Sequence, residues 1–110
     1  MKTINQLAVF VALSSLSLAS LAGDLAAGKV KAEACAGCHG ADGNKVLNPS
    51  YPRLAGQHKD YLAAALIAYQ RGSRNNAIMN AQAKQLSRVD IDNLSAYFAS
   101  LPGQLDYRKK

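Results

Sequence analysis

The sequence is poor in the residues that build most metal clusters and large cores. Its 110 residues include no tryptophan and only two cysteines, two histidines and two methionines. A structural zinc site needs four ligands, and the two cysteines with His39 and His58 show nothing resembling a second ligand cluster. A chain of this length has room for one small domain at most, which excludes a multidomain enzyme.

Strand patterns are also missing. No segment alternates apolar and polar residues with enrichment in β-branched side chains, so the sequence predicts an all-α fold. The basic residues are spread along the chain without the interleaved aromatics that stack on bases, which makes nucleic acid an unlikely partner class.

The longest apolar run, Leu7 to Leu21, is shorter than the roughly 20 residues that span a bilayer. It follows Lys2 and ends at Ser20-Leu21-Ala22, with small residues three and one before a cut at Gly23, so residues 1–22 are predicted to be a cleaved signal peptide. The mature domain is then 23–110, exported to the periplasm and without stable membrane insertion. Its twelve basic and seven acidic residues give +5, which favours redox partners with acidic docking surfaces.

Three helices are predicted in the mature chain. The first begins after the N-cap Asp24 and continues through the cysteine segment; the second covers Asp60 to Arg71 and is stopped by Gly72; the third opens at Ser87 and ends at Pro102-Gly103. The intervening segments, Gly40 to Gln57 and Ser73 to Gln85, are expected to be loops. Gly28, inside the first helix, marks either a tolerated loss of helix propensity or the close approach of a crossing helix.

The chemistry is carried by Cys35-Ala36-Gly37-Cys38-His39. C-x-x-C-H is the attachment sequence of c-type haem: two thiols three residues apart on one helical turn reach the two vinyl groups, and the adjacent histidine binds the iron. A redox disulfide and a zinc site are the weaker alternatives, because the strand that precedes a redox C-x-x-C and the further zinc ligands are both missing. Three short helices also make a small hydrophobic core, which at this size needs a disulfide, a metal or a cofactor to stabilise it.

The second axial ligand of the iron has few candidates. Met79 is the only methionine of the mature chain, lies 40 residues beyond His39, and falls in a polar segment with no core of its own to fill. The alternatives are His58, an open or water-bound iron, and a purely structural Met79 that plugs a gap in the core.

Four segments follow one another along the chain in this order: C-A-G-C-H-G-A-D-G, Y-P-R-L-A-G-Q-H-x-x-Y-L, the Met79 segment and L-S-x-x-D-I-x-x-L-S-A-Y-F. With these segments the sequence resembles the small class I cytochromes c, most closely one half of the bacterial tandem dihaem periplasmic cytochromes. The resemblance extends from Asp24 to Leu101. It implies three main helices around one covalent haem c. A departure is Ile78, which stands where many relatives have a proline before the distal methionine.

The resemblance also assigns roles. Cys35 and Cys38 would form the thioethers, His39 and Met79 would bind the iron, and the carbonyl of Pro52 would accept a hydrogen bond from His39. Gly28 would lie where the first helix crosses the last, against Leu94 and Tyr97. The residues expected as contacts of the haem propionates are Arg53, Gln57 and Arg74.

The function expected from such a site is electron transfer without catalysis. Two protein ligands leave no coordination position for a substrate, and a thioether ligand favours ferrous iron. The protein is expected to be a periplasmic carrier, a monomer or weak dimer, that delivers electrons to a terminal oxidase or reductase. The alternatives are a haem-based gas sensor and the haem subunit of a larger dehydrogenase.

Overall fold

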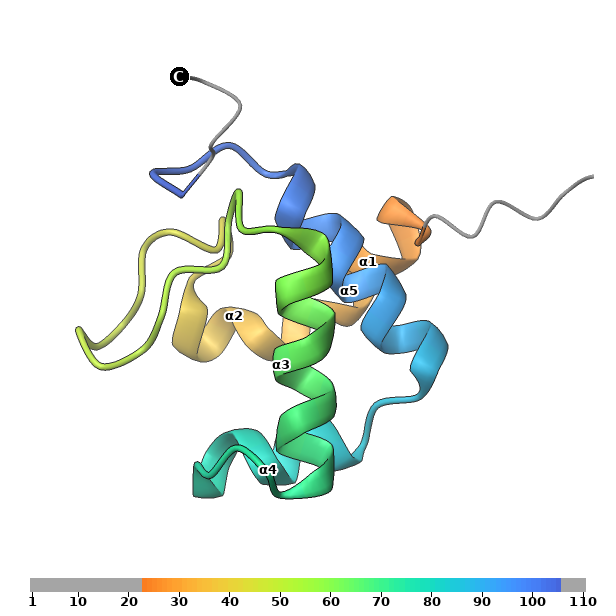
Figure 1. The fold of residues 1–110 in the computed structure, drawn as a ribbon. Helices are drawn as coiled ribbons and strands as arrows, with labels where there is room; N and C mark the ends of the chain where they lie inside the picture. Colours follow the sequence, from red (N-terminus) through yellow and green to blue (C-terminus); the bar gives the residue numbers. More distant parts are fainter. Residues whose placement is uncertain (1–22, 106–110) are drawn as a thin grey trace, which may run out of the picture.

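The computed structural model describes residues 23–105, which fold into five α-helices without strands (Figure 1). The helices are Leu25–Lys31 (α1), Glu33–His39 (α2), Lys59–Arg71 (α3), Ala77–Lys84 (α4) and Arg88–Ser100 (α5). The expected signal peptide and the last residues of the expected mature domain lie outside the described residues. In the described part of the chain, no helix is long and apolar enough to cross a membrane.

The helix ends follow the local signals in the sequence. The Asp24 side chain accepts hydrogen bonds from the first turn of α1, and Gly72 ends α3 in the left-handed conformation, with φ 75°. Ser87 and Asp90 form a capping box at α5, each side chain accepting from the backbone N–H of the other residue.

Two segments differ from the sequence prediction. The first helix is divided at Ala32, which caps both α1 and α2, so the cysteine segment forms a short helix of its own. The segment expected to be a polar loop contains α4, whose N-cap Asn76 accepts from the backbone N–H of Ile78 and Met79. Asparagine is a strong N-cap and alanine, methionine and glutamine are good helix formers, so these local preferences outweigh the weak apolar pattern.

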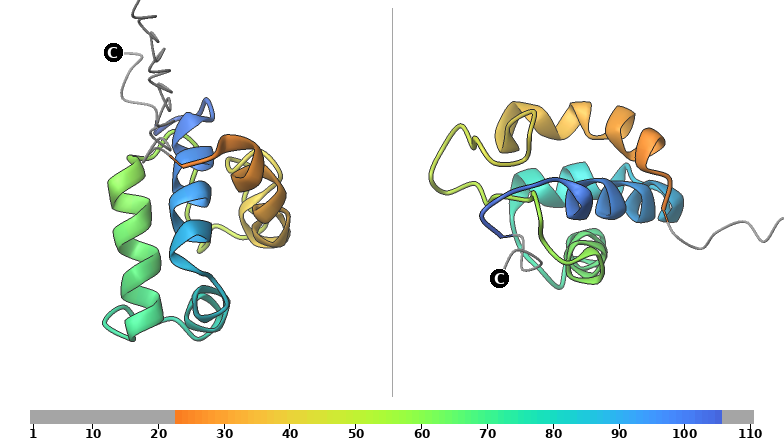
Figure 2. Two further views of the ribbon diagram at one scale, coloured as in Figure 1. Left: turned by 90° about the vertical axis from the view of Figure 1, so that its right-hand side faces the viewer. Right: turned by 90° about the horizontal axis from the view of Figure 1, so that it is seen from above.

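Helix α5 lies between α3 and the α1–α2 pair, as two views at right angles show (Figure 2). The approach of α1 requires Gly28: a Cβ there would lie 2.7 Å from Tyr97 Cβ and would overlap the carbonyl oxygen of Asn93. The close-approach interpretation of Gly28 is therefore correct. Tyr97 is the expected neighbour, and the nearest backbone is that of Asn93, the residue before the expected Leu94.

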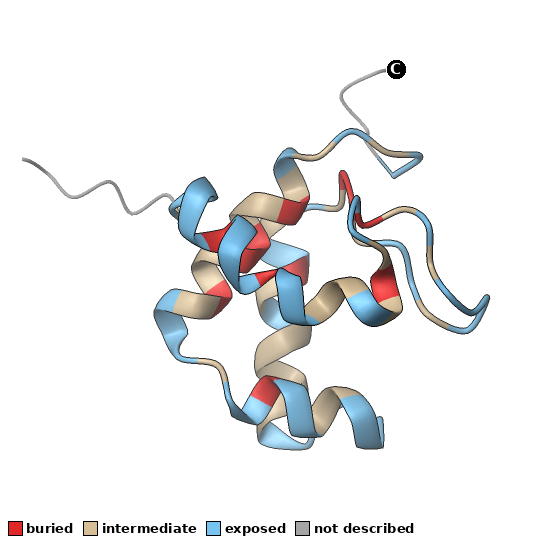
Figure 3. Ribbon diagram, turned by 180° about the vertical axis from the view of Figure 1, so that it is seen from behind, coloured by how far each residue is buried: buried red, intermediate tan, exposed pale blue. Residues whose placement is uncertain are grey.

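The core is small and centred on α5. Buried segments gather where α1 and α5 cross, whereas most of α4 is exposed (Figure 3). The buried apolar residues of the described chain are Ala32, Ala55, Leu62, Ala83, Ile91, Leu94 and Phe98. Three of these are alanines, so the helices alone bury little large apolar surface.

Candidate functional site

Helix α2 carries the two cysteines and the histidine of the C-x-x-C-H motif. Both cysteines are free and half-buried, and Cys35 packs against the core cluster. Burial, with a smaller effect of the neighbouring Cys38, raises the pKa of the Cys35 thiol. A thiol with a raised pKa is protonated at neutral pH, unlike the low-pKa nucleophile of a thiol redox enzyme.

His39 is buried at the end of α2, with 6% of its surface exposed. Its Nδ1 lies 2.8 Å from the carbonyl oxygen of Pro52, which can only accept, so Nδ1 carries the proton and donates. In the neutral imidazole with this tautomer, the lone pair of the other ring nitrogen, Nε2, is available to bind a metal. The ring also faces Tyr51, with 6.4 Å between the ring centroids.

Backbone hydrogen bonds anchor the segment that follows Pro52. The carbonyl of Gly43 accepts from the backbone N–H of Leu54 and of Ala55, at 2.9 and 3.2 Å. The N–H of Gly56 donates to the carbonyl of Phe98 in α5, at 2.9 Å. These bonds fix the Pro52 carbonyl relative to the helical core, so the orientation of His39 depends on the tertiary fold and not only on its neighbours in sequence.

Met79 lies in the first turn of α4 and is half-buried, while Ile78 before it is 52% exposed. Its position in a helix corrects the expectation of a polar loop. The end of α2 that carries His39 and the N-terminal end of α4 project to the same side of the α3–α5 pair (Figures 1 and 2). The fold therefore brings the helix ends that contain His39 and Met79, 40 residues apart in sequence, to one side of the α3–α5 pair.

The other candidates bind protein groups in this structure. The Gln57 side chain accepts from the backbone N–H of His58, the exposed residue that precedes α3. The Arg74 guanidinium lies 4.9 Å above the ring of Tyr69. Arg53 donates to the carbonyl of Asn44 and to the side chain of Gln104.

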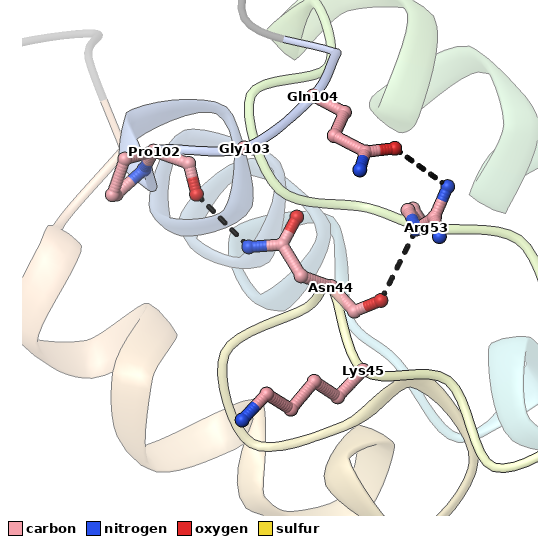
Figure 4. Close-up of a pocket in the computed structure, with 6 residues that line it drawn as sticks. All are labelled: Asn44, Lys45, Arg53, Pro102, Gly103 and Gln104. Atoms are coloured by element: carbon pink, nitrogen blue, oxygen red, sulfur yellow. Dashed lines mark hydrogen bonds between the residues drawn. The ribbon is translucent and has the colours of Figure 1, made fainter.

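Arg53 belongs to a hollow that is separate from the C-x-x-C-H helix (Figure 4). Arg53 Nη1 lies 2.8 Å from Gln104 Oε1, and Asn44 Nδ2 donates to the carbonyl of Pro102 at 3.0 Å. Lys45 and Gly103 complete its lining. The two hydrogen bonds join the segment after α5 to the loop that presents Pro52. Neither the cysteines nor His39 line this hollow.

Sequence reasoning missed the amide side chains that hold this framework together, namely Asn44, Gln70, Asn76, Asn80 and Gln104. Gln70 donates to one carbonyl in the last turn of α4 and one in the segment after it, and Asn80 does the same at α3. Only Asn76 had a local signal, since it is an N-cap residue before a run of helix formers. The other partners are distant in sequence and leave no periodic pattern.

The donor set fits a haem better than a bare metal ion. Among residues 23–105, no three His, Cys, Asp or Glu side chains gather where they could hold a metal. Two free thiols on one helix next to a buried histidine, whose Nδ1 is fixed by a carbonyl, are the groups that a covalent haem requires. Fold and site thus define a small helical protein built around a covalent haem.

Comparison with known proteins supports a covalent haem in a small helical fold. The model of the cytochrome c family matches residues 25–102, and the chain belongs to the cytochrome c family. It is 41% identical over 99 residues to cytochrome c4 of Pseudomonas aeruginosa, with 88% of this chain and 49% of the relative covered. It is 45% identical over 82 residues to cytochrome c-554(548) of Halomonas halodenitrificans, with 72% of this chain and 98% of the relative covered.

A solved structure agrees as well. Reduced recombinant cytochrome c4 from Pseudomonas stutzeri superposes with a TM-score of 0.70 at 37% identity, covering 76% of this chain and 48% of the other. The chain thus spans about half the length of the cytochromes c4 that it matches. The family assignment implies a covalent haem c, with which the C-x-x-C-H motif at Cys35 and Cys38 is consistent, and the all-α class I fold is confirmed.

Proposed function

We propose that this chain is a periplasmic one-electron carrier whose haem iron is bound by His39 and Met79. The observation that carries the proposal is the fixed geometry of His39, buried and donating from Nδ1 to Pro52. The end of α2 that contains His39 lies on the same side of the α3–α5 pair as the start of α4, which contains Met79 (Figures 1 and 2). When bound, the haem supplies the one-electron change of its iron. The export part of the proposal rests on the predicted signal peptide in residues 1–22.

The protein residues supply position and electronic tuning. Cys35 and Cys38 hold the cofactor by two covalent bonds, and the Pro52 carbonyl fixes the tautomer of His39 and makes Nε2 more basic. With His39 and Met79 both bound, no position remains for a substrate, which supports a carrier and not an enzyme. A thioether ligand raises the reduction potential relative to a second histidine.

The docking surface is expected to be basic. Every lysine and arginine of the described chain except Lys59 is exposed, and the mature sequence carries +5. Long-range attraction of this kind steers encounters with an acidic oxidase or reductase. The propionate contacts proposed for Arg53, Gln57 and Arg74 would require these side chains to turn from their present partners.

Replacing Met79 with alanine tests the ligand assignment. The thioethers and His39 would still hold the haem, so the variant should stay red, helical and soluble. The far-red ferric absorption band, a charge transfer from the methionine sulfur to the iron, should disappear. The reduction potential should fall, and the ferrous form should bind carbon monoxide. The matched variant His58→Ala should change none of these properties. If His58→Ala loses the native spectrum while Met79→Ala keeps it, the centre is bis-histidine and the proposal fails.

A second candidate function has support from one comparison. The cytochrome subunit of sulfide dehydrogenase from Chlorobaculum tepidum is 35% identical over 74 residues, with 67% of this chain and 66% of the relative covered. This chain would then be the haem subunit of a larger dehydrogenase. Size-exclusion chromatography of a native extract separates the two functions, because a subunit would elute with a large partner and a carrier would elute alone.

A further inference from the structure

The segment that carries Met79 is held by asparagine side chains on both sides of that residue. Asn76 Oδ1 accepts from the backbone N–H of Met79 at 3.0 Å, and the N–H of Asn76 donates to Asn80 Oδ1 at 2.9 Å. Asn76 and Asn80 are also joined through the backbone, where the N–H of Asn80 donates to the carbonyl of Asn76 at 2.8 Å. These hydrogen bonds join Asn76, Met79 and Asn80 to one another and fix the backbone on both sides of Met79.

Asn80 connects this set to α3. Its Nδ2 donates to the carbonyl of Tyr69 at 2.8 Å and to the carbonyl of Arg74 at 2.9 Å. Tyr69 is in the last turn of α3, and its carbonyl also accepts from the backbone N–H of the C-cap Gly72, at 3.3 Å. The two donated bonds therefore fix the start of α4 against the last turn of α3 and against the short segment that joins the two helices.

Here Ile78 precedes Met79, so no proline restricts the backbone at that position. We propose that Asn80 is a positioning residue for the distal ligand: through Asn76 and the end of α3 it holds the Met79 thioether in place and keeps the iron closed to external ligands. This inference rests on the proposed ligation by Met79.

The chain offers a matched control at the other end of α4. Gln70 in α3 also uses one amide nitrogen to donate two bonds to backbone carbonyls, those of Ala83 at 2.9 Å and Leu86 at 2.7 Å. Loss of either amide nitrogen removes one donated bond between α3 and α4 and one to the loop that follows a helix, at Arg74 for Asn80 and at Leu86 for Gln70. Asn80→Ala also removes the Oδ1 that accepts from Asn76. Only the loss of Asn80 frees the end that carries Met79.

The experiment measures the binding of free imidazole to the ferric holoprotein. An external ligand binds only when Met79 has dissociated, so its apparent affinity is proportional to the fraction of open protein. Two hydrogen bonds of ordinary net strength change such an equilibrium about tenfold or more. Asn80→Ala should therefore bind imidazole about tenfold more tightly and show a weaker far-red ferric band, whereas Gln70→Ala should stay within about twofold of the wild type.

Asn80→Asp gives a second measurement if the alanine variant folds poorly. It keeps the oxygen that accepts from Asn76 but cannot donate to the two carbonyls, so it should also bind imidazole more tightly. Equal imidazole affinity in the Asn80 and Gln70 variants would overturn the inference, because Asn80 would then be merely structural. Failure of the proposed function gives a different result: the wild-type ferric protein would lack the far-red band, and Met79→Ala would leave its spectrum unchanged.

Discussion

Replacing Gly28 with alanine should destabilise the holoprotein, although alanine is the better helix former. Two effects oppose each other. Alanine in a helix gains about 1 kcal/mol over glycine. Against this, the new Cβ would lie 2.7 Å from Tyr97 Cβ and would overlap the Asn93 carbonyl oxygen, a backbone atom inside α5 that cannot rotate away. Overpacking costs about 1–3 kcal/mol, and contact with backbone places this site at the upper end.

The expected net loss is about 2 kcal/mol, which corresponds to a melting temperature about 8–16 °C lower for a domain of this size. Thermal unfolding followed by circular dichroism at 222 nm measures it. The exposed neighbour Ala27 calibrates the propensity effect, since Ala27→Gly should cost at most about 1 kcal/mol. A Gly28→Ala protein that melts at or above the wild-type temperature would refute the packing argument.

Three further predictions concern the cofactor, pH and salt. Chemical removal of the haem should abolish most of the helical circular dichroism signal, because a core this small supplies at most about 3–5 kcal/mol; a cooperative melt of the stripped protein would contradict this. The backbone N–H of Ser87, which donates to the Asp90 carboxylate, holds the pKa of Asp90 below its usual value. This hydrogen bond therefore contributes to stability above the unfolded pKa of about 4, and the contribution is lost as the pH falls toward the folded pKa. Asp90→Asn should lower the melting temperature at pH 7 and make the melting temperature depend less on acid. The rate of electron transfer to an acidic partner protein should fall as salt rises, because charges are screened over about 8 Å at 0.15 M ionic strength, and a flat dependence would indicate apolar docking.

The elements that the sequence determined by itself are those specified by neighbouring residues. The apolar stripe that ends at Gly72 predicted α3 to within one residue, and the capping box at Ser87 and Asp90 located the start of α5. The C-x-x-C-H motif indicated the cofactor before any fold was known, because its chemistry depends on one helical turn. Local signals suffice where capping bonds and covalent attachment join residues within four positions of each other.

The tertiary structure decided what depends on distant contacts. The pattern at Gly28 allowed two interpretations, and only the crossing of α1 over the Asn93 backbone selects one. The position of the Pro52 carbonyl on His39 is fixed by bonds to the loop and to α5, and the attachment of α4 to α3 depends on the amides of Gln70 and Asn80. Such side-chain bonds to remote backbone carbonyls have neither the period nor the spacing that a sequence displays, so they exist only once the chain has folded.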